Sequence, residues 1–433
     1  RYQRNLEQCM KRKFINNLNW IIIGKLIQML LGFIVGIYST RYLGPLNYGI
    51  INYTASYISF FSVLVNLGID NYIMKELIDY KDKQGEVLGS GIVLRILSSL
   101  LAIIGLYGIL MITDKNDPVI QTVGFLQSLN LLFGSVNLIS YWYQMQLKSK
   151  TTSIITTIGY AIMTVYKIYI LILQKDIRYF AFTGTFETLL TTILLLALYR
   201  KDNGPKLEFS KTMAKDLLKN SYHFILSGLM VVIFNQTDKI MLKQMLDETV
   251  TGFYSLASNL CNYWTFILAA IITSANPIIL ESKKGNENHY YKRIRQLYAA
   301  VIWISVFVSL IITIAAPYII KLLYGEKYIQ SVAPLRILTW SVLFSYLGVA
   351  RGAWLVSEGL QRYAKYLTTI GAIANVIMNW LLIPQCGAFG AALATLLTQI
   401  IVNFIAPLFL KDLKKNSLLI IDAFLLKDVI NFE

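Results

Sequence analysis

The fold is decided by residues 41–70, which read RYLGPLNYGIINYTASYISFFSVLVNLGID. Gly44 and Pro45 predict a break in the chain, because glycine permits a turn and proline cannot continue a helix. From Gly49 an apolar and aromatic run of more than twenty residues follows, and about twenty residues span the hydrocarbon core of a bilayer. The stretch therefore predicts a turn followed by a membrane helix.

The composition of the whole chain also indicates a lipid environment. Its 433 residues are 56% hydrophobic and their mean hydropathy is +0.54, whereas soluble domains are roughly 45–50% apolar. In a soluble protein the net charge of +16 would suggest a nucleic-acid partner. Here the basic residues lie in short segments between apolar runs, where membrane topology explains them. We therefore expect the lipid bilayer as a partner and no nucleic acid.

The chain lacks the motifs of common metal and catalytic centres. Cys9, Cys261 and Cys386 lie far apart and form no CxxC pair, and His223 and His289 belong to no HExxH pattern. We expect no metal site, no disulfide framework, no catalytic residues and no cofactor other than a coupling ion, H⁺ or Na⁺.

Apolar runs of about 17–25 residues recur along the chain, and each is long enough to cross a bilayer as a helix. The expected helices are 14–38, 49–74, 88–112, 119–147, 151–173, 179–199, 220–243, 250–280, 296–320, 331–357, 361–384 and 386–410. The predicted fold class is therefore an all-α polytopic membrane protein with about twelve transmembrane helices.

The distribution of Lys and Arg predicts the orientation, because these residues favour cytoplasmic loops. With the N-terminus inside, the inner segments hold about four times as many basic residues as the outer loops. We therefore expect both termini on the cytoplasmic side of a bacterial cytoplasmic membrane. Residues 1–13 form a basic cytoplasmic segment, and because the chain begins at Arg1 we expect residues before it.

A polar stretch at 200–219 divides the chain into two halves of six helices, 14–199 and 220–410. Since six is even, both halves enter the membrane from the same side, as parallel repeats do. The tail at 411–433 contains a short apolar run interrupted by Asp422. This pattern predicts an amphipathic cytoplasmic tail, with its basic residues near anionic lipid, rather than a thirteenth span.

One segment of the first half recurs in the second half. YGIINYTASYISF at 48–60 resembles TGFYSLASNLCNY at 251–263, with an offset of 203 residues that aligns Gly49 with Gly252. Polar residues at i, i+4 and i+7 occupy one helix face in both segments, and such a face belongs toward protein or water. These residues are Asn52, Ser56 and Ser59 in the first copy and Ser255, Asn259 and Asn262 in the second.

Four segments together resemble the polysaccharide-transport branch of the multidrug/oligosaccharidyl-lipid/polysaccharide (MOP) flippase superfamily, most closely the O-antigen and capsule repeat-unit flippases. They are the opening stretch, FNQTDKIMLKQMLDETVTGFYSLAS from residue 234, PLRILTWSVLFSYLGVARGAWLVSEGLQRY from residue 334, and NWLLIPQCGAFGAALATLLTQ from residue 379. The resemblance implies two pseudo-symmetric six-helix bundles around a central cavity that opens alternately to either face. It implies transport of an undecaprenyl-pyrophosphate-linked oligosaccharide between leaflets, together with other polysaccharide-assembly membrane proteins.

A lipid pyrophosphate is anionic, so intramembrane cations are the first candidates for the substrate cavity. Six Lys or Arg residues lie within the expected helices. The candidates for the substrate cavity are three of them, Lys25, Arg95 and Arg351. Lys25 lies nearest a helix centre, where a charge costs about 2.5–3.5 kcal/mol, and it shares a helix face with Gln28. A structural ion pair with Asp70 or Glu187 is the alternative for Lys25, and a side chain reaching the membrane surface is the alternative for both arginines.

A sugar-binding site needs apolar surfaces that contact the sugar rings and polar groups that contact the sugar hydroxyls. We expect the two polar stripes, with Gln28, to contact sugar hydroxyls or to form interhelical hydrogen bonds. Tyr53, Tyr57 and Phe60 form an aromatic stripe that either stacks on sugars or packs against neighbouring helices.

Three acids, Asp70, Glu187 and Asp238, are candidates for ion coupling, because intramembrane carboxylates commonly serve in ion and proton pathways. A local ion pair with Lys239 is the alternative explanation for Asp238.

Two other transporters and an enzyme compete with this interpretation. A cation-coupled drug or metabolite antiporter of the same superfamily would favour a cavity rich in carboxylates, and a lipid II flippase is a further alternative. A membrane polymerase or glycosyltransferase would need a catalytic loop, but the expected outer loops have only a few residues.

Overall fold

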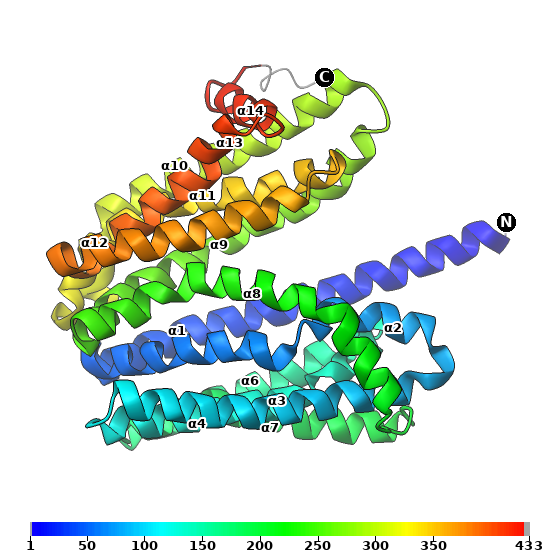
Figure 1. Ribbon diagram of the computed structural model, residues 1–433, viewed down its shortest axis with the longest axis horizontal. Helices are drawn as coiled ribbons and strands as arrows, with labels where there is room; N and C mark the ends of the chain where they lie inside the picture. Colours follow the sequence, from blue (N-terminus) through cyan, green and yellow to red (C-terminus); the bar gives the residue numbers. More distant parts are fainter. Residues whose placement is uncertain (1, 428–433) are drawn as a thin grey trace. The chain divides into compact units, whose positions relative to one another are not determined.

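The structure is a computed structural model that describes the backbone of residues 2–427 and, apart from residues 2–19, 21 and 22, their side chains. The described residues are almost entirely helical (Figure 1). The α-helices are α1 (Tyr2–Asn66), α2 (Ile73–Asp79), α3 (Gln84–Thr113), α4 (Pro118–Gly134), α5 (Ile139–Met145), α6 (Ser149–Ile172), α7 (Ile177–Lys201), α8 (Lys211–Met245), α9 (Glu248–Ser282), α10 (Glu287–Leu323), α11 (Val332–Ser357), α12 (Arg362–Ile400), α13 (Ala406–Phe409) and α14 (Lys414–Phe424).

Within the described residues, ten helical segments are long and apolar enough to cross a membrane. Two of them, Ile23–Asn66 with 44 residues and Arg362–Phe409 with 48 residues, are each long enough for two crossings. Both are interrupted by a glycine with positive φ, Gly44 (φ 71°, ψ 170°) and Gly387 (φ 56°, ψ −134°). Counting each as two crossings gives the twelve predicted spans, so the predicted fold class is confirmed.

Several predicted boundaries differ from the structure. The helix expected to reach residue 74 ends at Asn66, because Leu67 and Gly68 both have positive φ. A short 3₁₀ turn and α2 follow it. The helix expected at 119–147 is divided into α4, a 3₁₀ turn and α5. Residues 2–13 of the predicted basic segment are helical and begin α1, and the helix after the central polar stretch already begins at Lys211.

The chain forms two compact units. Unit 1 comprises Arg1–Leu43 and Thr54–Val232, and unit 2 comprises Gly44–Tyr53 and Ile233–Glu433. The ten residues after the Gly44 break therefore pack with the second half of the chain, although they belong to a helix of the first half. We call residues 44–53 the inserted segment.

Unit 1 is held together by a core cluster drawn from α2, α3, α5, α6, α7, α8 and the 3₁₀ turns before α2 and α5. Leu138 of the second turn and Leu217 of α8 are fully buried in it. The polar connection after α7 lies against α3. A Cβ on Gly85 would come within 2.0 Å of the Lys206 carbonyl oxygen, so glycine is needed for this close approach.

In unit 2, α11 packs against α9, α10 and α12 (Figure 1). The largest core cluster lies here and includes Tyr298 of α10 and Trp354 of α11. It also includes Leu419 and Ile420 of α14. One face of the tail helix is thus packed against protein, whereas residues 428–433 of the expected tail lie outside the described residues.

Candidate functional site

The most buried carboxyl group of unit 2 belongs to Asp238 on α8, whose residue is 3% exposed. Three hydroxyl or amide groups from two other helices donate hydrogen bonds to it. Tyr254 of α9 and Thr395 of α12 both donate to Asp238 Oδ2, the latter at 2.9 Å, and Asn379 of α12 donates to Oδ1. The carboxyl group therefore links α8, α9 and α12.

The glycine break in α12 explains how one helix supplies donors from two places. Asn379 precedes Gly387 and Thr395 follows it. After the break the chain returns close to itself, since a Cβ on Gly390 would lie 2.2 Å from the Leu382 carbonyl oxygen. The sequence IPQCGAFG thereby brings both arms of α12 to the same carboxyl group.

A second amide extends the polar cluster. Asn379 Nδ2 also donates to Asn375 Oδ1 at 3.0 Å, and both residues are fully buried. Among the described residues, Asn379 Oδ1 has no hydrogen-bond partner. A buried polar atom without a partner costs about 1–3 kcal/mol, so this cluster has unused capacity to bind a ligand.

A cavity of about 120 Å³ adjoins the cluster. Asp238, Tyr254 and Thr395 line it, and so does Asn262, the last residue of the predicted polar stripe. The volume accommodates a few water molecules at about 30 Å³ each. An intramembrane carboxyl group is therefore connected to a polar, hydratable space.

The chemistry of the cluster suits a proton or a monovalent cation. Asp238 contributes one negative charge, and hydroxyl and amide oxygens are hard neutral ligands. No group of three His, Cys, Asp or Glu side chains that could hold a metal ion is found among the described residues. Lys239, the alternative partner of Asp238, donates to Gln236 at 3.3 Å and interacts electrostatically with Asp238.

The inserted segment crosses α9 at two glycines. A Cβ on Gly49 would lie 1.7 Å from the Glu248 carbonyl oxygen, and a Cβ on Gly252 would lie 2.0 Å from the Pro45 carbonyl oxygen. No side chain fits at either position, so the two backbones touch directly, as at small-residue crossings of membrane helices.

Polar contacts flank this crossing. Asn259 donates to Tyr48 Oη at 2.7 Å and to Asn52 Oδ1 at 3.3 Å. Two residues of the predicted stripes are thus in direct interhelical contact. Ser255 is fully buried and its Oγ has no partner among the described residues.

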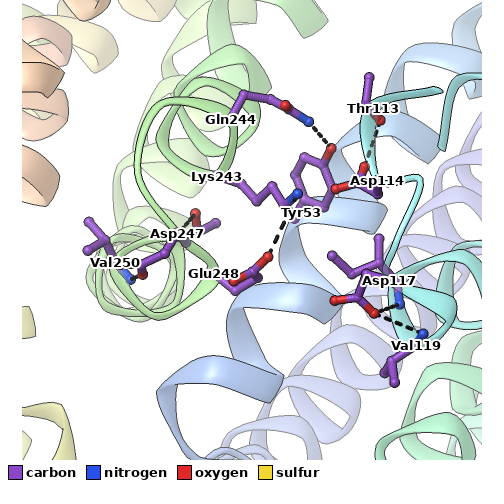
Figure 2. Close-up of polar contacts among 12 residues, drawn as sticks. Tyr53, Thr113, Asp114, Asp117, Val119, Lys243, Gln244, Asp247, Glu248 and Val250 are labelled. Atoms are coloured by element: carbon purple, nitrogen blue, oxygen red, sulfur yellow. Dashed lines mark hydrogen bonds and ion pairs between the residues drawn. The ribbon is translucent and has the colours of Figure 1, made fainter. Parts of the chain in front are cut away.

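The end of the inserted segment contacts the α8–α9 turn (Figure 2). Gln244 donates to Tyr53 Oη at 2.5 Å, and Lys243 Nζ lies 5.2 Å from the centre of the Tyr53 ring. Lys243 also pairs with Glu248 at 3.7 Å, and Asp247 caps α9 by accepting from the Val250 amide at 2.8 Å. Tyr53 is therefore buried among protein groups.

The other aromatic and hydroxyl residues of the predicted first stripe belong to unit 1. Tyr57, Phe60 and Ser59 are partly buried, and Ser56 is fully buried. Ser59 donates to the Ala55 carbonyl oxygen of its own helix at 3.0 Å.

In unit 1, the predicted cation Arg95 and the predicted acid Asp70 form an ion pair with each other, with an N···O distance of 2.6 Å. Lys25 is exposed. Gln28, on the same helix, donates to Thr157 Oγ1 of α6 at 3.3 Å. Lys25 therefore does not use Asp70 as its partner in this structure.

The remaining charged candidates also have neighbours. Glu187 of α7 interacts electrostatically with Lys167 of α6. Arg351, only 1% exposed, donates to the Asn403 carbonyl oxygen and, at 3.2 Å, to Asn416 Oδ1 of α14. Of the three predicted cations, Arg95 and Arg351 are buried, whereas Lys25 is exposed.

The sequence interpretation missed the partners of Asp238. Asn375 and Asn379 are four residues apart in an otherwise apolar helix, which places both amides on one face. That spacing is a signal for a buried polar face and could have identified them. Nothing in the sequence indicated Tyr254 or Thr395.

The fold resembles transporters of the MOP superfamily. An inward-facing multidrug resistance MATE family transporter of this superfamily has a TM-score of 0.67, with 14% identity over 92% of this chain and 99% of the other. The inward closed lipid II flippase MurJ has a TM-score of 0.74, with 14% identity over 95% and 93% of the two chains. The chain thus shares the fold of these two proteins.

Sequence comparison refines this class. Residues 14–283 match the family described as polysaccharide biosynthesis protein, and residues 224–381 match the family described as MatE. An uncharacterized membrane protein of Methanocaldococcus jannaschii is 19% identical over 94% of this chain and 86% of its own length. Because the first match covers more than half of the sequence, the chain belongs to the polysaccharide biosynthesis protein family.

Proposed function

We propose that this protein is a flippase that moves polyprenyl-pyrophosphate-linked oligosaccharide repeat units from the inner to the outer leaflet by alternating access. The observation that carries the proposal is the match of residues 14–283 to the polysaccharide biosynthesis family. The four motifs that resemble repeat-unit flippases support it. Lys25 supplies a cation for the pyrophosphate or for an acidic sugar.

A bound cation at Asp238 drives the cycle in this proposal. Binding replaces hydrogen bonds that now join Asp238 to Tyr254, Asn379 and Thr395. Because these residues lie on α9 and on both arms of α12, occupancy changes how three helices are held together. A cation that binds one arrangement better than another shifts the population of conformations by its difference in affinity.

The function is tested by deleting the gene in its host and analysing the lipid-linked intermediates. We expect a polyprenyl-pyrophosphate oligosaccharide to accumulate on the cytoplasmic leaflet, and a plasmid copy to remove it. If no such intermediate accumulates, the proposed substrate class is wrong.

The ion site is tested separately on purified protein. We expect Na⁺, exchanged for choline at constant ionic strength, to raise the Tm of the wild type but not of Asp238→Asn. Asp176→Asn is the matched control, because Asp176 pairs with Arg178 in an exposed ion pair of 3.6 Å. A Tm that does not respond to Na⁺ but a transport rate that requires Asp238 and a pH gradient would assign the site to H⁺. Full transport by Asp238→Asn would remove Asp238 from the mechanism.

Two alternative functions each have a specific observation in their favour. The similarity to the MurJ structure favours a lipid II flippase, which predicts accumulation of a peptide-bearing lipid intermediate in the deletion strain. The MatE match favours a cation-coupled exporter, which predicts increased drug sensitivity without any lipid-linked intermediate. The deletion experiment therefore separates all three.

A further inference from the structure

The face of α12 that carries Thr395 continues toward the C-terminus through two amide side chains. Thr395, Gln399 and Asn403 lie at i, i+4 and i+8, which places them along one face of the helix and of the turn that follows it. Thr395 donates to Asp238 at 2.9 Å, and Gln399 lines the same cavity as Asp238. Asn403 Nδ2 donates to Gln399 Oε1 at 2.7 Å. A hydrogen bond therefore joins the wall of this cavity to the turn after α12.

Asn403 lies in that turn, a π-helical turn at Ile401–Ile405 between α12 and α13. In a regular α-helix its carbonyl oxygen would accept from the amide of residue 407, but that residue is Pro407, which has no N–H. Arg351 of α11 donates to this carbonyl oxygen. A Cβ on Gly348, one turn before Arg351, would lie 2.3 Å from Asn403 Oδ1, so α11 lies directly against the π-turn. The arginine thus supplies a donor that the proline removes.

The same arginine joins the π-turn to the tail helix. Arg351 Nε donates to Asn416 Oδ1 of α14 at 3.2 Å, and Asn416 Nδ2 donates to Tyr298 Oη of α10 at 2.5 Å. Arg351, Asn416 and Tyr298 are each no more than 1% exposed. Buried polar groups are costly to leave without partners, so one guanidinium fixes both the place of α14 and the geometry of the π-turn. A continuous series of contacts within unit 2 thus leads from the tail helix to the cavity beside Asp238.

We propose that the tail helix α14 controls how tightly the Asp238 site binds its cation, with Arg351 as the positioning residue between them. This rests on the proposed function, in which a small cation binds at Asp238. When α14 is docked, Asn416 holds the Arg351 guanidinium and thereby the π-turn. The turn in this geometry keeps Gln399 and Thr395 at the cavity. Displacement of α14 removes an acceptor of Arg351 and releases the turn, so the affinity for the cation falls.

The π-turn is suited to carry this coupling because it has two discrete registers. Its hydrogen bonds join residues i and i+5, one residue further apart than in an α-helix, and coupling between sites needs an element with separate arrangements. Each residue of an α-helix corresponds to a rotation of about 100° about its axis. A shift of one residue in the turn would therefore rotate the face that carries Thr395 and Gln399 by about this angle. Arg351 opposes such a shift by bonding the Asn403 carbonyl oxygen.

The first test measures the cation affinity of tail variants in purified protein. Na⁺ replaces choline at constant ionic strength, and the Na⁺ concentration that gives half of the maximal rise in Tm is recorded. Asn416→Ala removes an acceptor of Arg351. Leu419→Ala is the matched control, because it removes apolar packing of the same helix from the core cluster but no hydrogen bond of Arg351.

We expect Asn416→Ala to raise this Na⁺ concentration about fivefold or more, the lower end of coupling between sites. Leu419→Ala should lower the Tm but leave the Na⁺ concentration unchanged, because the hydrogen bonds of Arg351 remain. Asn416→Asp keeps an acceptor for Arg351 and should stay near the wild type. Equal Na⁺ concentrations for Asn416→Ala and the wild type would overturn the coupling and leave the ion site intact.

The second test uses the reciprocity of coupling. If docking of α14 raises the affinity for the cation, the cation must favour docking of α14 by the same factor. Trypsin cleavage after Lys414 or Lys415, in the first turn of α14, reports the fraction of molecules in which this helix is open. We expect saturating Na⁺ to slow the cleavage about fivefold or more in the wild type, but not in Asp238→Asn. A wild type whose Tm responds to Na⁺ and whose tail cleavage does not would contradict the coupling.

The coupling and the Na⁺ site can fail separately. If Na⁺ changes neither the Tm nor the tail cleavage of the wild type, Na⁺ is not the cation of Asp238. The coupling is then tested with H⁺, from the ratio of the wild-type cleavage rate to that of Asp238→Asn in acidic and alkaline buffers. This ratio cancels the pH dependence of trypsin itself. A ratio that changes with pH supports the coupling, and a constant ratio overturns it.

Discussion

Asp238 and Lys25 are intramembrane charges with opposite surroundings. Asp238 is buried and accepts three hydrogen bonds, whereas Lys25 is exposed. A charge near the middle of a bilayer is costly unless it meets water, a partner or a ligand. These surroundings support the proposal that Asp238 binds a small cation and that Lys25 meets an anion that arrives from outside its helix.

Replacing Lys25 by Ala should reduce export of the lipid-linked oligosaccharide about tenfold or more. Charge-assisted hydrogen bonds contribute roughly 1.5–3 kcal/mol, and 1.4 kcal/mol corresponds to a factor of ten in affinity. Export is measured in the deletion strain at matched protein level. Lys25→Arg should retain most activity, and Lys81→Ala, in an exposed connection, is the control. Wild-type export by Lys25→Ala would remove this residue from the substrate site.

For single residues, the sequence identifies candidate side chains better than it identifies their hydrogen-bond and ion-pair partners. Asp238 was singled out within a motif, but its donors Asn379 and Thr395 follow 141 and 157 residues later. Arg95 and Asp70 were each assigned a separate role, although they pair with each other. Pairings over such distances depend on tertiary structure, which local patterns do not contain.

In helix α1, a single residue, Gly44, determines where the helix is interrupted. Gly44 interrupts a helix of 65 residues with a φ of 71°. A Cβ there would meet no atom within 4 Å. Its glycine is therefore required by backbone conformation alone, since a left-handed backbone costs roughly 1–2 kcal/mol for other residues.

Gly44→Ala should accordingly lower the free energy of unfolding by about 1–2 kcal/mol. Gly108→Ala is the matched control, because Gly108 also has open space around it but lies in regular helix α3. There alanine should be neutral or stabilising by up to about 1 kcal/mol. Thermal unfolding of both variants in the same detergent measures the difference. Equal Tm values would mean that the Gly44 backbone is not constrained.

Polar residues of the tail helix α14, which is predicted to be amphipathic, attach it to α10. Lys415 Nζ lies 3.9 Å from the centre of the Tyr291 ring and 3.5 Å from Glu287 Oε1. Its hydrogen bond to Tyr291 raises the pKa of Lys415. Deeper in the contact, Asn416 donates to Tyr298 Oη at 2.5 Å and accepts from Arg351. The tail is therefore a structural part of unit 2.

Asn416→Ala should loosen α14, because it removes the hydrogen bond to Tyr298 and one of the two acceptors of Arg351, at a cost of about 1–3 kcal/mol. Limited proteolysis should cut the tail faster than in the wild type, and the Tm should fall. Lys414→Ala, at an exposed position of the same helix, controls for local helix propensity. An unchanged cleavage rate would show that these hydrogen bonds do not hold the tail.

For the whole molecule, hydropathy was sufficient to predict twelve spans in an all-helical fold. The length of an apolar run is a local property that can be read from a single sequence, without an alignment. Hydropathy did not indicate that residues 44–53 pack with unit 2, because it does not distinguish a helix face that contacts lipid from one that contacts protein. The 203-residue echo contained that information, since the repeated glycines meet each other in the structure.

Topology is the whole-molecule property that the basic residues predict most directly. The connection after α7 carries Lys206 and Lys211 and is expected to be cytoplasmic, whereas the connection between α6 and α7, near Asp176, is expected outside. Alkaline phosphatase should therefore be active when fused after Asp176 and inactive after Lys206, and green fluorescent protein should fluoresce at the C-terminus. The two fusion sites control for each other, because both follow the same spans except α7. The opposite pattern would invert the predicted topology of the chain.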